Sequence, residues 1–328
     1  ALHALRLAGA ESLTVLGSPA SWGFLRKAHG APRVRDFSSS EWLGLFAAGV
    51  AFGPAARATL ARTQTAIVAL HGDTARTEKA LREAGVQQAL FVPPPLAEPF
   101  PPPLAGGGRG RGDVGLHAAR RLLDPLAPLL GAGVAEAALA IEAVADDVFL
   151  ELDEAERVRG LARLGYDDVP GAGFVAIHPG SGGRRKCWPA ERYAKLAVKL
   201  AGQGALTPLL LFGPADEDTR REFEARIPPG ADWECVAERP LREVLALLSC
   251  ARCYVGNDSG ITHLAARACP TVALFGPTDP RVWAPLGQRV KIVQAPGGVL
   301  DRLEVDEVAE EIQSGLRDQS SRAAALRG

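Results

Sequence analysis

The chain has 328 residues, 47% of them hydrophobic and 23% charged, with 37 basic against 38 acidic side chains. This length fits two domains that each bury a core, and the composition is that of an ordinary soluble globular protein, which excludes a single small module and a disordered chain. The near-neutral charge gives no broad field for binding DNA or RNA, and acidic residues interrupt the most apolar stretches before they could span a bilayer. We therefore expect no nucleic-acid partner and no membrane span, whereas docking to a membrane surface stays open.

The chain begins with Ala1, contains no methionine, and lacks the charged and then apolar segments of a signal peptide. We interpret the missing methionine as a sign that the true start precedes Ala1 or that methionines have been lost from the sequence. Five cysteines include one close pair, Cys250 and Cys253, which is not the dense pattern of a secreted disulfide scaffold. We expect a cytoplasmic protein whose cysteines pack in the core, and we disfavour a redox pair or half of a zinc site.

The first half shows short apolar runs at residues 13–16, 66–70 and 89–92, each followed by a break or by a helical stretch. This alternation is typical of a βα pattern. Residues 93–113 hold too many prolines and glycines for a regular element, so we expect an exposed loop there. That loop is either a plain surface insertion or a segment that gates a substrate.

In the second half of the chain, apolar strand-like runs and helical segments alternate more regularly than in the first half. Strands that are apolar throughout and separated by helices predict a parallel sheet covered on both faces, with a second such sheet in the weaker first half. A charged amphipathic helix over residues 151–166 marks a domain boundary, so we expect domains over residues 1–150 and 151–328. The expected strands are 174–178, 208–212, 252–255 and 271–275, and the expected helices include 190–203, 240–250 and a C-terminal one within 304–328.

Ligands bind outside the carboxyl ends of parallel strands, so the loops after the strands are the first candidates for a site. The loop HPGSGGRRKCWP over residues 178–189 contains Gly180, Ser181, Gly182 and Lys186. Glycines let backbone N–H groups approach an anion, the serine adds a hydroxyl donor, and the lysine adds a compact positive charge. The combination favours a phosphate-binding loop over a glycine-rich turn with solvated basic residues.

The loop GNDSGITHLAAR over residues 256–267 places Asp258 or Ser259 at the start of a helix, with Gly260 leaving the first-turn amides uncovered. Helix amino ends bind phosphate, but aspartate and serine are also ordinary helix caps, and both interpretations stay open. His263 follows Ser259 by four residues and either faces the same anion or packs.

Two further loops, residues 212–218 and 275–283, carry Gly-Pro after an apolar strand. Glu217 in the first of them either accepts hydrogen bonds from ribose hydroxyls or complements the dipole of the helix that follows. Trp188 and Trp283 either stack on a nucleobase or pack between helix and sheet. Together the four loops indicate one crevice that suits a nucleotide diphosphate with a sugar attached.

These motifs resemble glycosyltransferase family 9, the bacterial heptosyltransferases that build the inner core of lipopolysaccharide. The match covers HPGSGGRRKCWP and the stretch over residues 255–287, and more faintly residues 4–20. The resemblance implies an α/β protein of the GT-B fold, in which two Rossmann-like domains with parallel sheets face a central cleft. In that arrangement the N-terminal domain binds the acceptor and the C-terminal domain binds the nucleotide sugar.

The resemblance further implies an inverting, metal-independent transfer of heptose from ADP-heptose to a lipid-linked saccharide, with no cofactor and with peripheral contact to the inner membrane as an open option. It places Asp258 near the phosphates, but because a carboxylate repels a diphosphate we assign Asp258 to the sugar, and we expect Lys186 and Asp258 to be the catalytic residues. It assigns donor binding to Gly180, Ser181, Gly182, Lys186, Glu217, Ser259, Gly260 and His263. Lys186 and the amides of residues 259–261 would stabilise the departing diphosphate in place of a metal ion.

Family members open with a strand and a glycine-rich loop whose aspartate is proposed as the general base, and this sequence begins after that point. We expect that this segment is missing from the sequence or, less favoured, that the protein is impaired. Loss of a general base lowers the reaction rate about 10²- to 10⁴-fold. The alternatives are a nucleotide-sugar 2-epimerase and a non-catalytic nucleotide- or saccharide-binding relative. An oxidoreductase is disfavoured, because no GxGxxG follows a strand.

Overall fold

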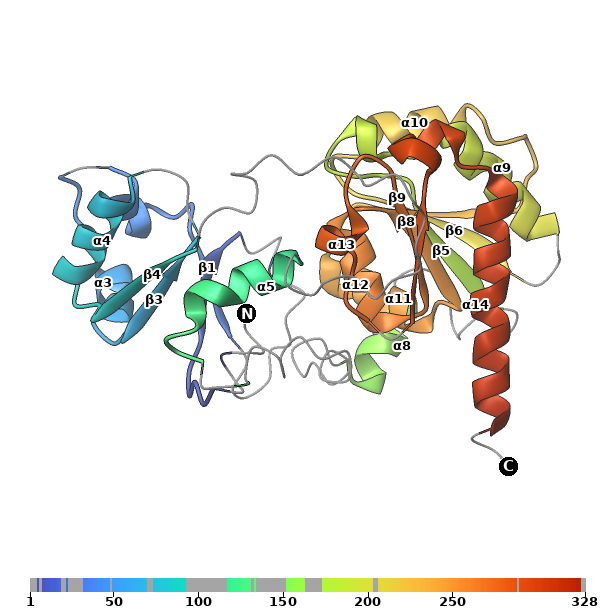
Figure 1. Ribbon diagram of the computed structural model, residues 1–328. Coiled ribbons are helices and arrows are strands. Elements are labelled where there is room, and N and C mark those ends of the chain that lie inside the picture. The colour runs from blue at the N-terminus through green and yellow to red at the C-terminus, as the bar shows by residue number, and fades with distance from the viewer. Residues whose placement is uncertain are drawn as a thin grey trace. The chain divides into compact units, whose positions relative to one another are not determined.

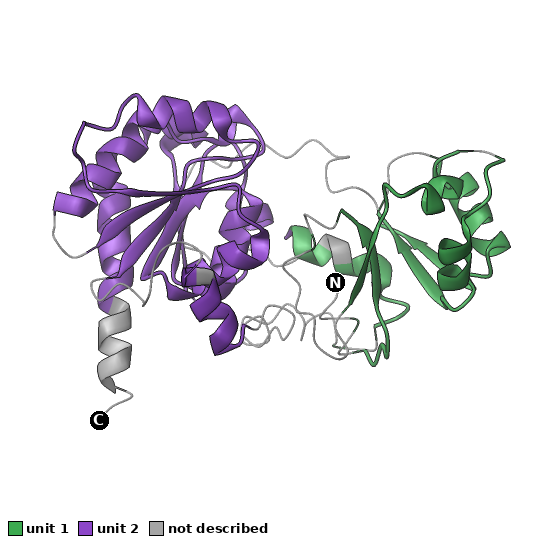
Figure 2. Ribbon diagram, turned by 180° about the vertical axis from the view of Figure 1, so that it is seen from behind, with its two compact units in different colours: residues 1–100, 118–140 green, residues 101–117, 141–328 purple. Residues whose placement is uncertain are grey.

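The computed structural model describes most of the chain. It covers residues 5, 8–18, 22, 32–47, 49–69, 73–92, 117–130, 133, 152–162, 173–202, 206–287 and 289–325. The chain forms two compact units, residues 1–100 with 118–140 and residues 101–117 with 141–328 (Figure 2). The expected boundary near residue 150 stays a prediction, because residues 134–151 lie outside the described ranges.

The second unit is built on a sheet whose described strands all run parallel, in the order β10-β9-β8-β5-β6-β7. The strands are β5 (Phe174–His178), β6 (Thr207–Phe212), β7 (Glu234–Ala237), β8 (Cys253–Asn257), β9 (Thr271–Phe275) and β10 (Val290–Gln294). All five residues of β5 are buried, as are those of β8 and β9. The prediction of a parallel sheet covered on both faces is therefore confirmed for this half.

Helices cover both faces of this sheet (Figure 1). On one face α14 packs against α9 and against β8, β9 and β10, whereas α12 and α11 pack together on the other, with α8 against α11. The helices are α8 (Glu154–Ala162), α9 (Ala190–Gly202), α10 (Glu217–Glu224), α11 (Leu241–Cys250), α12 (Gly260–Ala268), α13 (Pro280–Trp283) and α14 (Val305–Ala325). Short 3₁₀ turns are η4 (Arg184–Lys186), η5 (Pro296–Gly298) and η6 (Leu300–Arg302).

The core of this unit follows from the alternation of side chains along the strands. Val175 and Ile177 of β5 point to the face that carries Leu196 of α9 and Val308 of α14, and all four belong to one buried cluster. Successive strand residues point to opposite faces, so their buried neighbour Ala176 points to the α11 and α12 side. A strand buried on both faces must be apolar throughout, which is why these strands could be predicted.

The first unit contains two parallel strand pairs, β1 with β2 and β3 with β4. Its core gathers Trp42, Phe52 and Leu60 beneath the β3–β4 pair, together with Val68 and Leu81. The strands are β1 (Thr14–Gly17), β2 (Arg33–Asp36), β3 (Thr65–Val68) and β4 (Gln88–Phe91). The helices are η1 (Ser40–Leu45), α3 (Pro54–Leu60), α4 (Thr74–Glu83), α5 (Ala118–Leu123) and η3 (Asp124–Leu126).

Three strands escaped the sequence analysis: β2, β7 and β10. Two of them, β7 and β10, are the edges of the six-stranded sheet, where one side of the strand remains exposed. In β2 only Val34 is apolar among four residues. An edge strand needs no continuous apolar run, so its sequence gives a weak signal. The proline-rich stretch over residues 93–113 lies outside the described residues. Within the described part of the chain, no helix has the length and apolar character needed to cross a membrane.

We expect Leu196→Ala to lower the free energy of unfolding by about 2–5 kcal/mol, because it leaves a cavity beside the fully buried strands. Val198→Ala on the same helix is the matched control, since Val198 is 38% exposed, and should cost less than about 0.5 kcal/mol. Chemical denaturation of both variants measures the difference. Equal losses would contradict the assignment of this face of α9 to the core.

Candidate functional site

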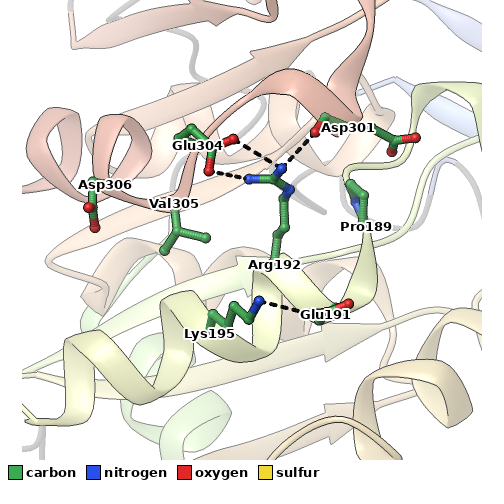
Figure 3. A pocket seen from close by; sticks show the side chains of 8 residues that line it. All are labelled: Pro189, Glu191, Arg192, Lys195, Asp301, Glu304, Val305 and Asp306. Atoms are coloured by element: carbon green, nitrogen blue, oxygen red, sulfur yellow. Dashed lines mark hydrogen bonds and ion pairs between the residues drawn. The ribbon is translucent and has the colours of Figure 1, made fainter.

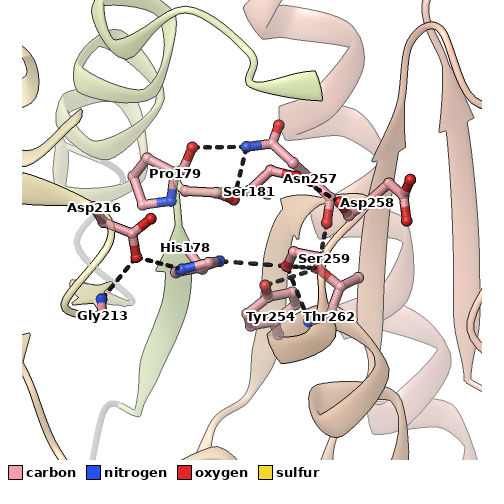
Figure 4. A network of polar contacts seen from close by, with 11 residues as sticks. His178, Pro179, Ser181, Gly213, Asp216, Tyr254, Asn257, Asp258, Ser259 and Thr262 are labelled. Atoms are coloured by element: carbon pink, nitrogen blue, oxygen red, sulfur yellow. Dashed lines mark hydrogen bonds and ion pairs between the residues drawn. The ribbon is translucent and has the colours of Figure 1, made fainter. Parts of the chain in front are cut away.

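Four loops meet at the carboxyl ends of β5, β6, β8 and β9, which are neighbours in the sheet. They follow His178, Phe212, Asn257 and Phe275. Because these strands are parallel, their carboxyl ends lie at one edge and their loops can contact one another. Hydrogen bonds join the loop after β5 to those after β6 and β8, as Figure 4 shows. The loops that the sequence predicts to form one site therefore lie at the same edge of this sheet.

Asn257 at the end of β8 holds the glycine-rich loop in place. Its Nδ2 donates to the carbonyl oxygen of Pro179 at 2.7 Å, and its Oδ1 accepts from the Trp188 amide at 2.9 Å and from the Tyr193 hydroxyl at 3.0 Å. The side chain is completely buried. Sequence reasoning missed this residue, although a polar residue at the end of an otherwise apolar buried strand was a usable signal.

Lys186 and Asp258, predicted from separate loops, meet. Lys186 Nζ lies 3.0 Å from Asp258 Oδ2, which also accepts a hydrogen bond from the Thr278 hydroxyl at 2.9 Å. Ser181 donates to the backbone carbonyl of Asp258 at 2.7 Å. The Asp258 side chain is almost fully buried while that of Lys186 is 38% exposed, so the ammonium faces both its partner and solvent. This pairing answers how a carboxylate can sit beside an anion site: its charge is balanced within the protein.

The amino end of α12 lies beside this pair. Ser259 is its N-cap, and the serine Oγ accepts from the Thr262 amide at 3.4 Å. Gly260 begins the helix, and a Cβ added there would meet no protein atom within 4 Å. The first amides of a helix have no partner within it, and the helix dipole adds partial positive charge. The arrangement can bind an anion such as a phosphate.

His263 lies in the first turn of α12. Its pKa is lowered, chiefly because surrounding protein atoms displace water from the ring although the residue keeps a side open to solvent; the nearby charge of Asp258 acts in the opposite direction. A lowered pKa leaves the imidazole neutral at pH 7. His263 can therefore offer an anion a hydrogen bond rather than a full positive charge.

Glu217 begins α10, is well exposed, and pairs with Arg221 one turn later at 3.3 Å. In the described part of the chain it is the preceding residue, Asp216, that reaches the polar network. Asp216 Oδ2 accepts from the Gly213 amide at 2.7 Å and lies 3.1 Å from His178 Nε2. The carboxylate expected at this site was the neighbouring Glu217, whose contact with the ribose stays a prediction.

The aromatic and cysteine assignments separate in the structure. Trp188 is 1% exposed, packs edge-on against Tyr193 and donates from Nε1 to the Leu303 carbonyl, so it packs rather than stacks on a base. All five cysteines are free thiols, and burial raises the pKa of Cys253 to about 12. The buried Cys253 and Cys269 confirm the prediction that the cysteines pack in the core. That prediction is wrong for Cys235, which is exposed.

A separate pocket lies between the start of α9 and the segment leading into α14 (Figure 3). Arg192 in its wall pairs with Glu304 at 2.7 Å and donates to the Asp301 carbonyl at 2.7 Å, and Lys195 pairs with Glu191 at 2.8 Å. The contacts of Arg192 tie α9 to the segment before α14, whereas the Lys195–Glu191 pair lies within α9. The pocket is thus a seam between helices, separate from the four-loop site.

Two glycines of this loop differ in the space available for a side chain. A Cβ at Gly180 would lie 1.9 Å from Asp216 Oδ1, whereas a Cβ at Gly182 would meet nothing within 4 Å. We expect Gly180→Ala to lower the free energy of unfolding by about 1–3 kcal/mol through overpacking, and Gly182→Ala to change it by less than about 0.5 kcal/mol. Thermal or chemical unfolding of the pair measures this. A Gly180→Ala variant as stable as the wild type would contradict the packing of Asp216 against the loop.

Comparison with known proteins places these observations. The model of glycosyltransferase family 9 (heptosyltransferase) matches residues 134–310, more than half of the chain. Lipooligosaccharide heptosyltransferase 2 of Haemophilus influenzae is 36% identical over 136 residues, which are 40% of this chain and 36% of that protein. The matched segment thus spans little more than a third of this relative's length.

Solved structures extend the likeness to the fold. The structure of Escherichia coli ADP-heptose LPS heptosyltransferase II has a TM-score of 0.67 at 17% identity, covering 97% of this chain and 93% of that one. A family 9 glycosyltransferase from Veillonella parvula has a TM-score of 0.60 at 17% identity, covering 94% and 97%. These likenesses confirm an α/β protein of the GT-B fold. The family match over more than half of the sequence shows that this chain belongs to glycosyltransferase family 9.

Proposed function

We propose that this protein is an inverting glycosyltransferase that moves heptose from ADP-heptose to the inner core of lipopolysaccharide. The observation that carries the proposal is the meeting of Lys186 with Asp258 beside the open amino end of α12, in a chain of a family described by heptose transfer. Two relatives are named as heptosyltransferases of lipooligosaccharide and lipopolysaccharide, which favours heptose transfer over a 2-epimerase or a non-catalytic binding protein. We propose a cytoplasmic location for it.

In this proposal residues 151–328 bind the nucleotide sugar and residues 1–150 bind the lipid-linked acceptor. Departure of the nucleoside diphosphate develops negative charge, which Lys186 and the first amides of α12 would stabilise. Asp258 keeps the Lys186 ammonium at the crevice and offers a second carboxylate oxygen to a sugar hydroxyl. Gly180, Ser181 and Gly182 would lie along the diphosphate, and His263 would donate a hydrogen bond to it. Glu217 would accept from the ribose.

We expect ADP to raise the melting temperature more than UDP, GDP, CDP or dTDP, because a ligand that binds only the folded state stabilises it. Lys186→Ala should weaken ADP binding about 10- to 100-fold, as for loss of a charge-assisted hydrogen bond, and lower kcat about 10²-fold or more with ADP-heptose and a heptose-free acceptor. Lys195→Ala, which removes an exposed lysine outside the four loops, is the control and should match the wild type.

The outcomes of this panel separate the candidate functions. Selectivity for UDP would move the proposal to another sugar donor or to the epimerase, which turns over donor without acceptor. No melting shift with any of the five nucleotides would overturn the assignment of the four loops to a donor site.

An apolar patch in the first unit supports peripheral contact with the membrane that carries the acceptor. Phe37, Leu43 and Phe46 lie around η1 and are 40%, 46% and 42% exposed, with the two phenylalanine rings 6.1 Å apart. Exposed aromatic and aliphatic side chains bind the apolar boundary of a bilayer. We propose that this patch, defined by these three residues, rests on the cytoplasmic face of the inner membrane.

Phe46→Ser should reduce co-sedimentation with vesicles of mixed zwitterionic and anionic lipid by about tenfold, because burying a phenylalanine contributes about 1.5–3 kcal/mol. Val158→Ser removes a more exposed apolar side chain in the second unit and should leave vesicle binding unchanged. Wild-type protein that stays in the supernatant, or equal binding by both variants, would refute the patch as a membrane contact.

A further inference from the structure

His178, the last residue of β5, links the loops after two other strands. It is 5% exposed; its Nε2 lies 3.1 Å from Asp216 Oδ2 in the loop after β6, and its Nδ1 lies 3.5 Å from the Ser259 hydroxyl after β8 (Figure 4). One imidazole thus bridges a buried carboxylate and the N-cap of α12. Neither His178 nor Asp216 has a part in the binding scheme described above.

The protons in this bridge can be assigned from its partners. Burial alone would raise the pKa of Asp216, but the hydrogen bonds from His178 and from the Gly213 amide hold that pKa below its usual value. An ionised carboxylate only accepts hydrogen bonds, so His178 Nε2 carries the proton between them. With that proton on Nε2, the ring presents Nδ1 to the Ser259 hydroxyl as an acceptor.

The Ser259 hydroxyl is therefore turned inward. Its proton has two acceptors, His178 Nδ1 and the Thr262 hydroxyl at 3.1 Å, because Thr262 already donates its own proton to the Asn257 carbonyl. Its oxygen in turn accepts from the Thr262 amide as the helix cap. With Ser259 occupied in this way, the donors that face an anion at this end are the backbone amides of Gly260 and Ile261.

We propose that His178, held by Asp216, is a positioning residue that fixes Ser259 and through it the direction of the first amides of α12 toward the diphosphate. The inference rests on the proposed donor site. Asp216 sets the tautomer and orientation of the ring, and the ring orients the cap. Burying a carboxylate–imidazole pair costs desolvation free energy, and in this site the buried pair orients these amides.

The test separates the two nitrogens of the ring. In His178→Asn the amide group occupies the place of Nδ1 and keeps the contact with Ser259, whereas in His178→Gln it occupies the place of Nε2 and keeps only the contact with Asp216. ADP affinity is measured by calorimetry for both, for Ser259→Ala, and for the double variant of His178→Gln with Ser259→Ala. Melting temperatures and circular dichroism confirm that each variant folds.

We expect His178→Gln to weaken ADP binding about five- to tenfold, as for one lost hydrogen bond, and His178→Asn to stay within about twofold of the wild type. Ser259→Ala should weaken it to a similar extent as His178→Gln, and the double variant should be no weaker than Ser259→Ala alone, because residues that act through one another are not additive. Asp216→Asn tests the same pathway with the imidazole ring left in place. It should weaken ADP binding about threefold, and this loss should be absent in a variant that also carries Ser259→Ala.

The remaining outcomes overturn the inference. Additive losses in the double variant, unchanged ADP affinity in His178→Gln, or equal losses with glutamine and asparagine would each show that His178 does not act through Ser259. Those results, with wild-type ADP binding and its loss in Lys186→Ala intact, leave the proposed function standing. A wild-type protein that binds none of the five nucleoside diphosphates overturns the donor site and this inference together.

Discussion

The buried amide of Asn257 is the contact on which the geometry of the site depends. It donates to the Pro179 carbonyl near the start of the glycine-rich loop and accepts from the Trp188 amide near the end of that loop, so one side chain fixes both ends. A buried polar group left without its partner costs about 1–3 kcal/mol, which makes any other path of this loop unfavourable. Lys186 lies between these two anchored points and is thereby held toward β8 rather than left free in solvent.

The charges of the site are arranged as a pair before any ligand arrives. Asp258 is nearly buried, and a buried carboxylate without a partner is strongly destabilising, so Lys186 and the Thr278 hydroxyl serve the folded protein as well as the chemistry. An ammonium has three donors, and its partial exposure leaves some of them for an incoming anion. A diphosphate therefore adds to an existing ion pair, and its binding does not require the buried carboxylate to lose its counter-charge.

Much of the second unit could be predicted from the sequence because its central strands are buried on both faces and must be apolar throughout, as in β5 and β9. The edge strands β7 and β10 face solvent on one side and left no such pattern. The meeting of Lys186 with Asp258 was predictable in kind, since both follow neighbouring parallel strands. That Asp216 rather than Glu217 reaches the network was not predictable, because the two carboxylates are adjacent in sequence and tertiary contacts with Gly180, Gly213 and His178 distinguish them.

That same packing explains why Gly180, Asp216 and His178 occur together at the ends of two neighbouring strands, β5 and β6. Asp216 occupies the volume that a side chain at position 180 would fill, and there it is within reach of His178. The imidazole reaches on to Ser259 across the ends of β5 and β8. Hydrogen bonds in such a chain polarise one another in the low dielectric of the interior, so the position of the helix cap is coupled to a carboxylate two strands away. The apolar sheet holds the strand ends rigidly, and the hydrogen-bonded series Asp216, His178 and Ser259 along its carboxyl edge orients the amino end of α12.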